Sequence, residues 1–304
     1  MTKMKLTILG SGSALPTEHR FNSSHILSIG EKNFMIDCGE GAQIKLRQYK
    51  IRTAKLHHIF ISHLHGDHCF GLIGLISTLA MLNRKENLYI FAHADLEKIL
   101  QPQIDYFCQD IPFKVVFNPI NPRKQAIIFE DKSIKVTTIP LKHGIQCCGF
   151  LFEEKEKEKH LIKDKIEFYN IPVSKLHLIK KGADFVSANG EVIANNQLTN
   201  EPEAPKKFAY CSDTLPLEKI IPYIKGVDAL FHEATFSEKE KSRAKETFHS
   251  TTKQAATIAL KAEVKNLIIG HYSARYGSTD KLVEETKAVF ENTFAAEDGS
   301  EFEF

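Results

Sequence analysis

The chain has 304 residues, of which 42% are hydrophobic, and its formal net charge is +2. Such a chain can bury a large core, so we expect one sizeable domain or one domain with an insertion. The net charge neither demands nor excludes a nucleic-acid partner, so any RNA binding must come from local basic patches.

Membrane and secretory signals are missing from the sequence. No apolar stretch reaches the roughly 18 residues of a membrane-spanning helix. The first residues run into a strand-like pattern with no apolar core of a signal peptide. The six cysteines have no Cys-x-x-Cys spacing, which is typical of reduced thiols in a cytosolic protein. We therefore expect a cytoplasmic protein.

Short strand-like runs alternate with helical patterns along most of the chain. Strands are expected at residues 5–10, 24–29, 33–37, 58–62, 88–92, 114–117, 125–130, 134–139, 207–210, 229–231 and 266–269. Helices are expected at residues 42–49, 70–82, 95–101, 216–225, 252–262 and 279–290. A mixed α/β chain with two similar halves predicts two sheets covered by helices on both outer faces.

Residues 153–200 interrupt this alternation. They begin with a run of alternating Glu and Lys at 153–159, continue with a helix-like stretch at 161–169 and include a hairpin-like segment at 188–193. The charged run alone is compatible with a solvated hairpin or linker. The whole segment is predicted to be an insertion that leaves the core.

The run at residues 61–71 is rich in metal-binding side chains. His63, His65, Asp67 and His68 fall within six residues, directly after an expected strand. Imidazole nitrogen and carboxylate oxygen suit zinc and similar divalent ions. Side chains alternate in an extended stretch, and a bend at Gly66 would turn His68 towards a second position. One loop can therefore supply two adjacent metal sites.

The missing ligands are expected at other strand ends. His143, Asp213 and His271 each follow a short apolar run by a few residues. Taken singly, each has an ordinary explanation: a hydrogen-bonded loop histidine, or a helix cap in the case of Asp213. Their shared placement favours a common metal centre.

These residues, with four further segments, resemble the ribonuclease Z family within the metallo-β-lactamase superfamily. The segments are Gly-Ser-Gly-Ser-Ala-Leu-Pro-Thr at 10–17, Asp-Cys-Gly-Glu-Gly at 37–41, His-Glu-Ala-Thr-Phe at 232–236 and His-Ser-Thr at 249–251. The resemblance covers residues 4–292. It implies an αββα sandwich, and an endonuclease that removes the 3′ trailer from precursor tRNA and leaves a 3′-hydroxyl.

The resemblance also implies two Zn²⁺ ions per chain, with a shared water as nucleophile. It places His63, His65 and His143 on one ion, and it places Asp67, His68 and His271 on the other. Asp213 bridges both ions. Asp67 additionally orients the water or accepts its proton.

A proton donor is needed for the ribose 3′ oxygen that leaves. His249 is the candidate, and Glu233 would hold its imidazolium charged. His249 also precedes a probable helix start around Ser250 or Thr251, and a helix N-terminus itself favours a phosphate.

The insertion at 153–200 takes the place of the family's tRNA-binding arm. Lysines that could follow a phosphate path are Lys163, Lys165, Lys175, Lys180 and Lys181. The family's arm often carries a Gly-Pro pair where this chain has Val173, Ser174 and Lys175. In the family a homodimer lets the arm of one subunit hold tRNA while the other subunit cuts.

Two alternative functions compete with this one. Another hydrolase of the superfamily, acting on a cyclic phosphodiester, thioester or lactone, would share the metal ligands but need neither the arm nor His249. A metal-storage protein would close each ion with a fourth protein ligand.

Overall fold

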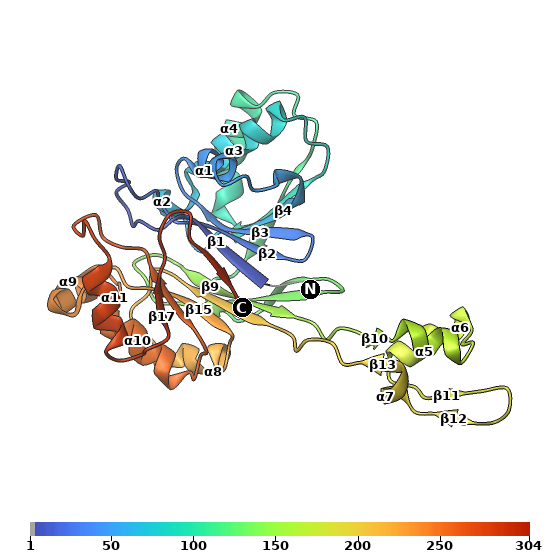
Figure 1. The fold of residues 1–304 in the computed structure, drawn as a ribbon. Helices are drawn as coiled ribbons and strands as arrows, with labels where there is room; N and C mark the ends of the chain where they lie inside the picture. Colours follow the sequence, from blue (N-terminus) through green and yellow to red (C-terminus); the bar gives the residue numbers. More distant parts are fainter. Residues whose placement is uncertain (1–3) are drawn as a thin grey trace. The chain divides into compact units, whose positions relative to one another are not determined.

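The computed structural model describes residues 4–304 (Figure 1). The chain forms two compact units. The first contains the described residues up to Phe129, together with Val136–Phe152 and Lys206–Phe304, and the second contains Glu130–Lys135 and Glu153–Pro205. Among residues 4–304, no helix has the length and apolar character that a membrane crossing requires.

The first sheet has seven strands in the order β18-β1-β2-β3-β4-β5-β6. Their bounds are Glu301–Glu303, Met4–Gly10, Ser24–Ile29, Lys32–Cys38, Leu56–Phe60, Leu88–His93 and Val115–Ile120. The strands from β18 to β3 pair antiparallel, and those from β3 to β6 pair parallel. The central strands are buried on both faces, which explains their nearly continuous apolar sequences.

The second sheet also has seven strands, in the order β17-β16-β15-β14-β9-β8-β7. Their bounds are Thr293–Ala295, Leu267–Gly270, Ala229–Glu233, Lys207–Cys211, Cys148–Glu154, Ile134–Pro140 and Ile127–Glu130. Strands β14 to β17 pair parallel, so their carboxyl ends meet at one edge. Asp213 and His271 lie just beyond that edge.

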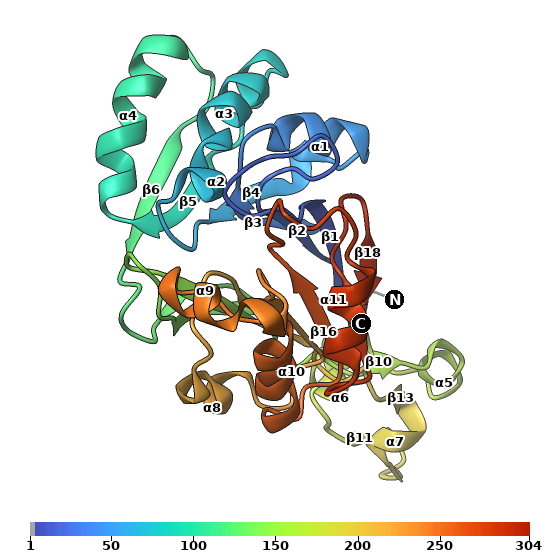
Figure 2. The same ribbon diagram turned by 90° about the vertical axis from the view of Figure 1, so that its left-hand side faces the viewer.

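The two sheets pack face to face, and helices cover their outer faces (Figures 1 and 2). Between the sheets, the ring of Phe60 lies 5.6 Å from that of Phe150 and 5.4 Å from that of Phe152. The helices on the first sheet are α1 (Ala42–Gln48), α3 (Gly71–Met81) and α4 (Asp95–Phe107). Those on the second sheet are α8 (Ile221–Ile224), α10 (Thr252–Lys261) and α11 (Asp280–Lys287). The first unit is therefore the expected αββα sandwich.

Helix α4 extends six residues beyond the predicted end at residue 101. The residue after the predicted end is a proline, which usually terminates a helix. In the structure Pro102 lies inside α4, and Leu96, Leu100 and Ile104 bury one face of the helix against the first sheet. The burial of this face outweighs the single hydrogen bond that the proline removes.

The second unit has an apolar core of its own. Its elements are β10 (His160–Leu161), α5 (Lys163–Phe168), α6 (Val173–Lys180), β11 (Phe185–Val186), β12 (Val192–Ile193), α7 (Asn195–Leu198) and β13 (Thr199–Asn200). Its core consists of Ile171, Ile179, Phe185, Ile193 and Leu198. The buried Asn195 amide donates to the carbonyls of Ile179 (2.7 Å) and Ala183 (2.9 Å), which ties α7 to α6.

Candidate metal centre

The histidine-rich run leaves strand β4 and enters one turn of helix. His63 and His65 precede α2 (Gly66–Cys69), and His65 has an extended backbone as its N-cap. Asp67 and His68 lie within that turn. The backbone changes from extended to helical at Gly66. The rings of His63 and His68 still lie 4.1 Å apart, but their Nε2 atoms belong to different groups of ligands.

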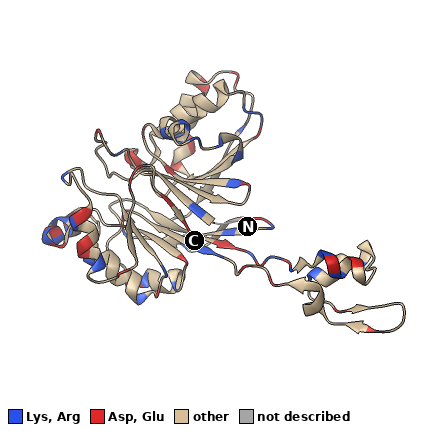
Figure 3. Cartoon of the chain, in the orientation of Figure 1, with Lys and Arg blue, Asp and Glu red and all other residues tan. Residues whose placement is uncertain are grey.

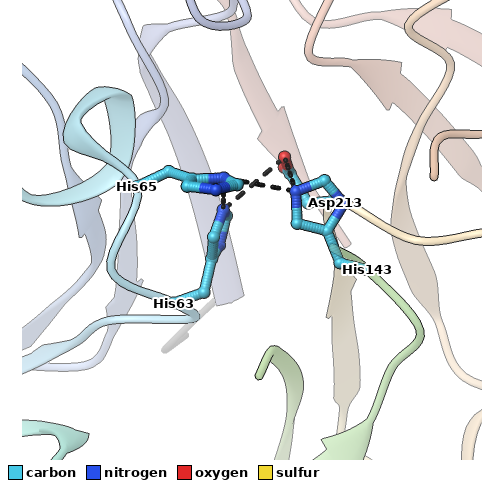
Figure 4. Close-up of side chains that lie close together, drawn as sticks. All are labelled: His63, His65, His143 and Asp213. Atoms are coloured by element: carbon cyan, nitrogen blue, oxygen red, sulfur yellow. Dashed lines mark hydrogen bonds and ion pairs between the residues drawn. The ribbon is translucent and has the colours of Figure 1, made fainter. Parts of the chain in front are cut away.

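Four ligand-type atoms converge from three segments (Figure 4). His65 Nδ1 lies 3.0 Å from His63 Nε2 and 3.2 Å from His143 Nε2. Asp213 Oδ2 lies 3.6 Å from both His63 Nε2 and His143 Nε2. Zinc–nitrogen and zinc–oxygen bonds place neighbouring ligands of a tetrahedral site roughly 3.3 Å apart. The spacing of this cluster therefore fits a tetrahedral metal ion.

A second cluster uses the other oxygen of the same aspartate. Asp213 Oδ1 lies 3.2 Å from both His68 Nε2 and His271 Nε2, and those two nitrogens lie 3.3 Å apart. Asp67 Oδ2 lies 3.5 Å from each of them. Asp67, His68 and His271 therefore form a second group of ligands, close to the second oxygen of Asp213. The two oxygens of Asp213 thus face different clusters.

Hydrogen bonds fix the free nitrogen of the histidines that follow β4. The Nδ1 atom of His68 donates to Asp37 Oδ2 at 2.8 Å. Ser62 Oγ uses its proton on Asp37 Oδ2 at 3.0 Å, so it accepts from His63 Nδ1, also at 3.0 Å. Both rings therefore donate from Nδ1. Their Nε2 atoms face the clusters, where a metal ion would take the place of a proton.

The same reasoning applies to the two distant histidines. His143 Nδ1 donates to the carbonyl of Phe248 at 3.1 Å. Thr235 Oγ1 gives its proton to Glu233 Oε2 at 2.6 Å, so it accepts from His271 Nδ1 at 3.0 Å. The Nε2 atoms of both rings are left free to bind a metal.

Burial and neighbouring charges set suitable protonation states. Burial lowers the pKa of His63, His65 and His143, which keeps these rings neutral. Burial alone would raise the pKa of Asp213, but His271 and His68 outweigh it and hold that pKa well below the usual range. The first cluster therefore consists of three neutral imidazoles and an ionised carboxylate, a set that suits zinc.

Left-handed backbone conformations gather at this site. The φ angles of Asp37, Asp213, Phe248 and His271 are 55°, 45°, 59° and 60°. Non-glycine residues adopt this conformation rarely, because Cβ crowds the backbone. Such outliers persist where the surrounding structure fixes them, and they cluster at functional sites. Asp213 and His271 follow β14 and β16, Asp37 lies near the end of β3, and Phe248 precedes α10.

His249 is paired with Glu233, beside the metal-binding side chains. Its Nδ1 lies 2.9 Å from Glu233 Oε1. Burial alone would lower the pKa of His249, but the charge and hydrogen bond of Glu233 outweigh it and raise the pKa to about 9. Glu233 also accepts from the backbone N–H of Thr214 (2.6 Å) and Ser250 (3.1 Å). His249 is therefore a firmly held, protonated imidazole.

Several of these groups border one cleft of about 680 Å³. Its lining includes His65, Asp67, His143, Asp213, His249 and His271. Arg243, Arg275 and Phe70 line it as well and were not predicted as site residues. Asp37 and Thr235 were also missed, although both lie in segments that carried the family resemblance. Their support of His68 and His271 depends on contacts that the sequence does not reveal.

The five predicted RNA-binding lysines lie in the second unit, whereas the metal clusters belong to the first. Lys163, Lys165, Lys175 and Lys181 are exposed, and Lys180 is half-buried. Lys180 and Lys181 border a cavity of about 520 Å³ together with Lys157 and Lys159. Glutamates border the same cavity, and acidic and basic side chains mix along α5 (Figure 3).

Curated relatives match the chain over nearly its whole length. Ribonuclease Z of Bacteroides fragilis is 52% identical over 298 residues, which cover 98% of each chain. The chain belongs to the ribonuclease Z family. Ribonuclease Z of Phocaeicola vulgatus is 54% identical and covers 97% of this chain and 96% of its own. Ribonuclease Z of Porphyromonas gingivalis is 49% identical over 97% of both chains.

Solved structures show the metallo-β-lactamase fold. The short form of human tRNase Z superposes with a TM-score of 0.72 at 22% identity, covering 98% of both chains. The metallo-β-lactamase fold protein YhfI of Bacillus subtilis superposes with a TM-score of 0.69 at 19% identity, covering 99% of this chain and 100% of its own. As a member of the ribonuclease Z family, the protein is an endoribonuclease with a metal-dependent site.

A family model described as anti-Pycsar protein Apyc1 matches residues 4–164, so this part of the chain belongs to that family as well. The match includes His63, His65, Asp67, His68 and His143. It ends before Asp213 and before the segments around Glu233, His249 and His271. The relatives that cover those later segments are ribonucleases Z.

Proposed function

We propose that this enzyme removes the 3′ trailer from precursor tRNA by hydrolysing one phosphodiester bond, leaving a 3′-hydroxyl on the tRNA. The observation that carries the proposal is the position of Asp213 between two sets of three ligands, so that neither ion has a fourth ligand of its own. The His249–Glu233 pair lies beside them, and Asp213 and His249 line one cleft. Two cationic positions and an acid are the groups that in-line displacement at phosphorus requires.

Each cluster would hold one zinc ion, so two Zn²⁺ are proposed per chain. His63, His65, His143 and Asp213 would hold the first ion, and Asp67, His68, His271 and Asp213 the second. When bound, the ions supply positive charge that stabilises the attacking and leaving oxygens of the phosphodiester.

The protein's own groups would move the protons. Asp67 has a pKa that is lowered by His68 and His271 against the effect of burial, so it is ionised and can orient an attacking water. His249 would donate its proton to the ribose 3′ oxygen as that oxygen leaves. Glu233 would then stabilise the ring throughout the reaction, because its carboxylate stays ionised.

The second unit would bind the body of the tRNA. The support for this role is the number of lysines in the unit, although glutamates lie among them. These lysines include Lys163, Lys165, Lys175, Lys180 and Lys181. The homodimer remains a prediction of the family resemblance. The cytoplasmic location remains a prediction from the cysteine spacing and the lack of a signal-peptide pattern.

The proposed function is tested by mapping the ends of a 3′-extended precursor tRNA after incubation with the zinc-loaded enzyme. We expect one cut near the end of the acceptor stem, with a 3′-hydroxyl on the tRNA. A cyclic phosphodiester, a thioester and a lactone are assayed in parallel. Turnover of one of these without tRNA cleavage would replace the proposal with the alternative of another superfamily hydrolase.

His249→Ala should reduce the cleavage rate by about 10²–10⁴-fold, as is typical of a lost general acid, and leave metal content unchanged. The control is a substrate with an acidic leaving group at the same phosphate, which needs no proton from the enzyme. The variant should be nearly restored on that substrate. An equal loss on both substrates would show that His249 holds the phosphate and does not deliver the proton.

A further inference from the structure

Phe70 presents an aromatic ring to the cleft. It is 69% exposed, and it borders the same cleft as Gly66, Asp67 and His249. Single exposed apolar side chains are common and need no explanation elsewhere on a surface. Most groups that line this cleft are charged or polar, whereas the exposed ring of Phe70 offers an apolar, aromatic surface.

The ring of Phe70 packs against Gly66. A Cβ atom added to Gly66 would lie 2.3, 2.5 and 2.7 Å from Cε2, Cζ and Cδ2 of Phe70. Near-equal distances to three consecutive ring atoms place that position over the face of the ring and not at its edge. One face therefore lies against the Gly66 backbone, and the high exposure belongs to the rest of the ring.

The backbone beneath Phe70 is fixed as well. Its N–H donates to the carbonyl of Gly66 at 2.9 Å, within the turn of α2. A Cβ atom added to the next residue, Gly71, would lie 2.0 Å from the carbonyl oxygen of Gly39. The start of α3 thus packs tightly against the chain after β3. Little conformational entropy remains to be lost when a ligand covers the ring.

A nucleobase is the ligand that this ring suits. Proteins that bind unpaired RNA stack bases on aromatic side chains, while charged groups contact the phosphates. In this cleft the metal-binding residues, His249, Arg243 and Arg275 are the groups suited to contact a phosphate. We propose that Phe70 stacks against the unpaired base of a nucleotide next to the scissile phosphate. The proposal rests on the proposed ribonuclease function and adds a substrate contact to it.

Stacking acts on the bound substrate and on the transition state alike, so its loss should raise KM and leave kcat nearly unchanged. The size of a lost base–aromatic contact corresponds to about 5- to 150-fold. Phe70→Ala should therefore raise KM for precursor tRNA within that range. Phe70→Tyr should retain the wild-type KM. Phe70→Leu keeps the packing on Gly66 but has no ring, so its KM should rise nearly as much as that of Phe70→Ala.

The test compares these variants on three substrates: normal precursor tRNA, and precursors with an abasic nucleotide on either side of the cleaved bond. The matched control is Phe107→Ala, because Phe107 is 67% exposed but does not border the cleft. We expect wild type and Phe70→Ala to have equal KM on one abasic precursor and unequal KM on the normal one. Metal analysis of each variant accompanies the kinetics.

Three outcomes would overturn the proposal. The first is a KM of Phe70→Ala no higher than that of Phe107→Ala. The second is the same loss on the normal substrate and on both abasic ones, which would mean that the ring meets something other than a base. The third is loss of metal in Phe70→Ala with unchanged KM in Phe70→Leu, which would give the ring a purely structural role. A wild-type enzyme that cuts none of the precursors would overturn the proposed function itself.

Discussion

At the scale of single residues, Asp213 joins the two ligand clusters, because each of its oxygens faces a different one. Both oxygens lie within 3.6 Å of two histidine nitrogens. A carboxylate in this position reduces the repulsion between two dications, so neither ion should bind well without it.

Asp213→Ala should therefore abolish the binding of both ions, whereas His271→Ala should mainly weaken the binding of one. The measurement is metal content per chain after exhaustive dialysis against a fixed concentration of free zinc. His249→Ala is the control, since its ring is paired with Glu233 and should not be needed for metal binding. One ion that survives Asp213→Ala unchanged would refute the bridging role.

Asp37 supports the centre through four hydrogen bonds. Its buried carboxylate accepts from the backbone N–H of Ser62 (2.8 Å) and its hydroxyl (3.0 Å), from His68 Nδ1 (2.8 Å) and from the Tyr210 hydroxyl (2.8 Å). These partners come from both sheets, so Asp37 fixes the position of β14 relative to β4.

Asp37→Ala should lower the free energy of unfolding by about 3–5 kcal/mol, because it leaves buried partners unpaired. Tyr210→Phe removes one of the four bonds and should cost about 1 kcal/mol. Both are measured by denaturant unfolding at one fixed zinc concentration, since bound metal adds to apparent stability. Equal costs for the two variants would mean that the other three bonds contribute little.

At the scale of elements, helix α10 (Thr252–Lys261) begins three residues after His249. Thr251 is its N-cap: its hydroxyl accepts from the N–H of Gln254 at 3.3 Å, and its own N–H donates to the Gln254 side chain at 2.9 Å. The sequence placed a cap at Ser250 or Thr251, and this reciprocal pair decides for Thr251.

Thr251→Ala should lower the free energy of unfolding by about 1 kcal/mol, the usual cost of a lost N-cap. The control is Thr257→Ala, within the same helix, where alanine should be neutral or slightly stabilising because of its higher helix propensity. Thermal unfolding of both variants at the same zinc concentration is the measurement. A loss of stability in Thr257→Ala as large as in Thr251→Ala would remove the cap as the cause.

Replacing residues 156–203 with a short Gly-Ser linker tests the second unit. The second unit has its own core, so the sandwich should fold without it, and hydrolysis of a small phosphodiester should persist. Cleavage of precursor tRNA at low concentration should fall severely, because binding energy away from the reacting bond is lost. Rates on the two substrates are compared at equal metal content. Unchanged tRNA cleavage would reduce the unit to an ordinary insertion.

At the scale of the whole molecule, the sequence predicted the sandwich because strand and helix patterns are local. The structure also brings together the residues that were predicted as metal ligands. His271 directly follows β16, and Asp213 follows β14 by two residues. Their positions could therefore be predicted from the ends of the expected strands. Asp37 escaped prediction because its partners Ser62 and Tyr210 are 25 and 173 residues away. Strands β17 and β18 escaped because three residues each are too few for a recognisable alternation.

The position of strand β18 also affects how the chain folds during its synthesis. It covers the outer edge of β1, and the ion pair between Lys5 and Glu301 joins residues 296 positions apart. A ribosome adding 5–20 residues per second needs about 15–60 s to make the chain between them. Throughout that time β1 exposes an unpaired edge, the kind of surface on which nascent chains aggregate. The outer edge of β1, the first strand to be synthesised, therefore stays unpaired until β18, the last strand, has been made.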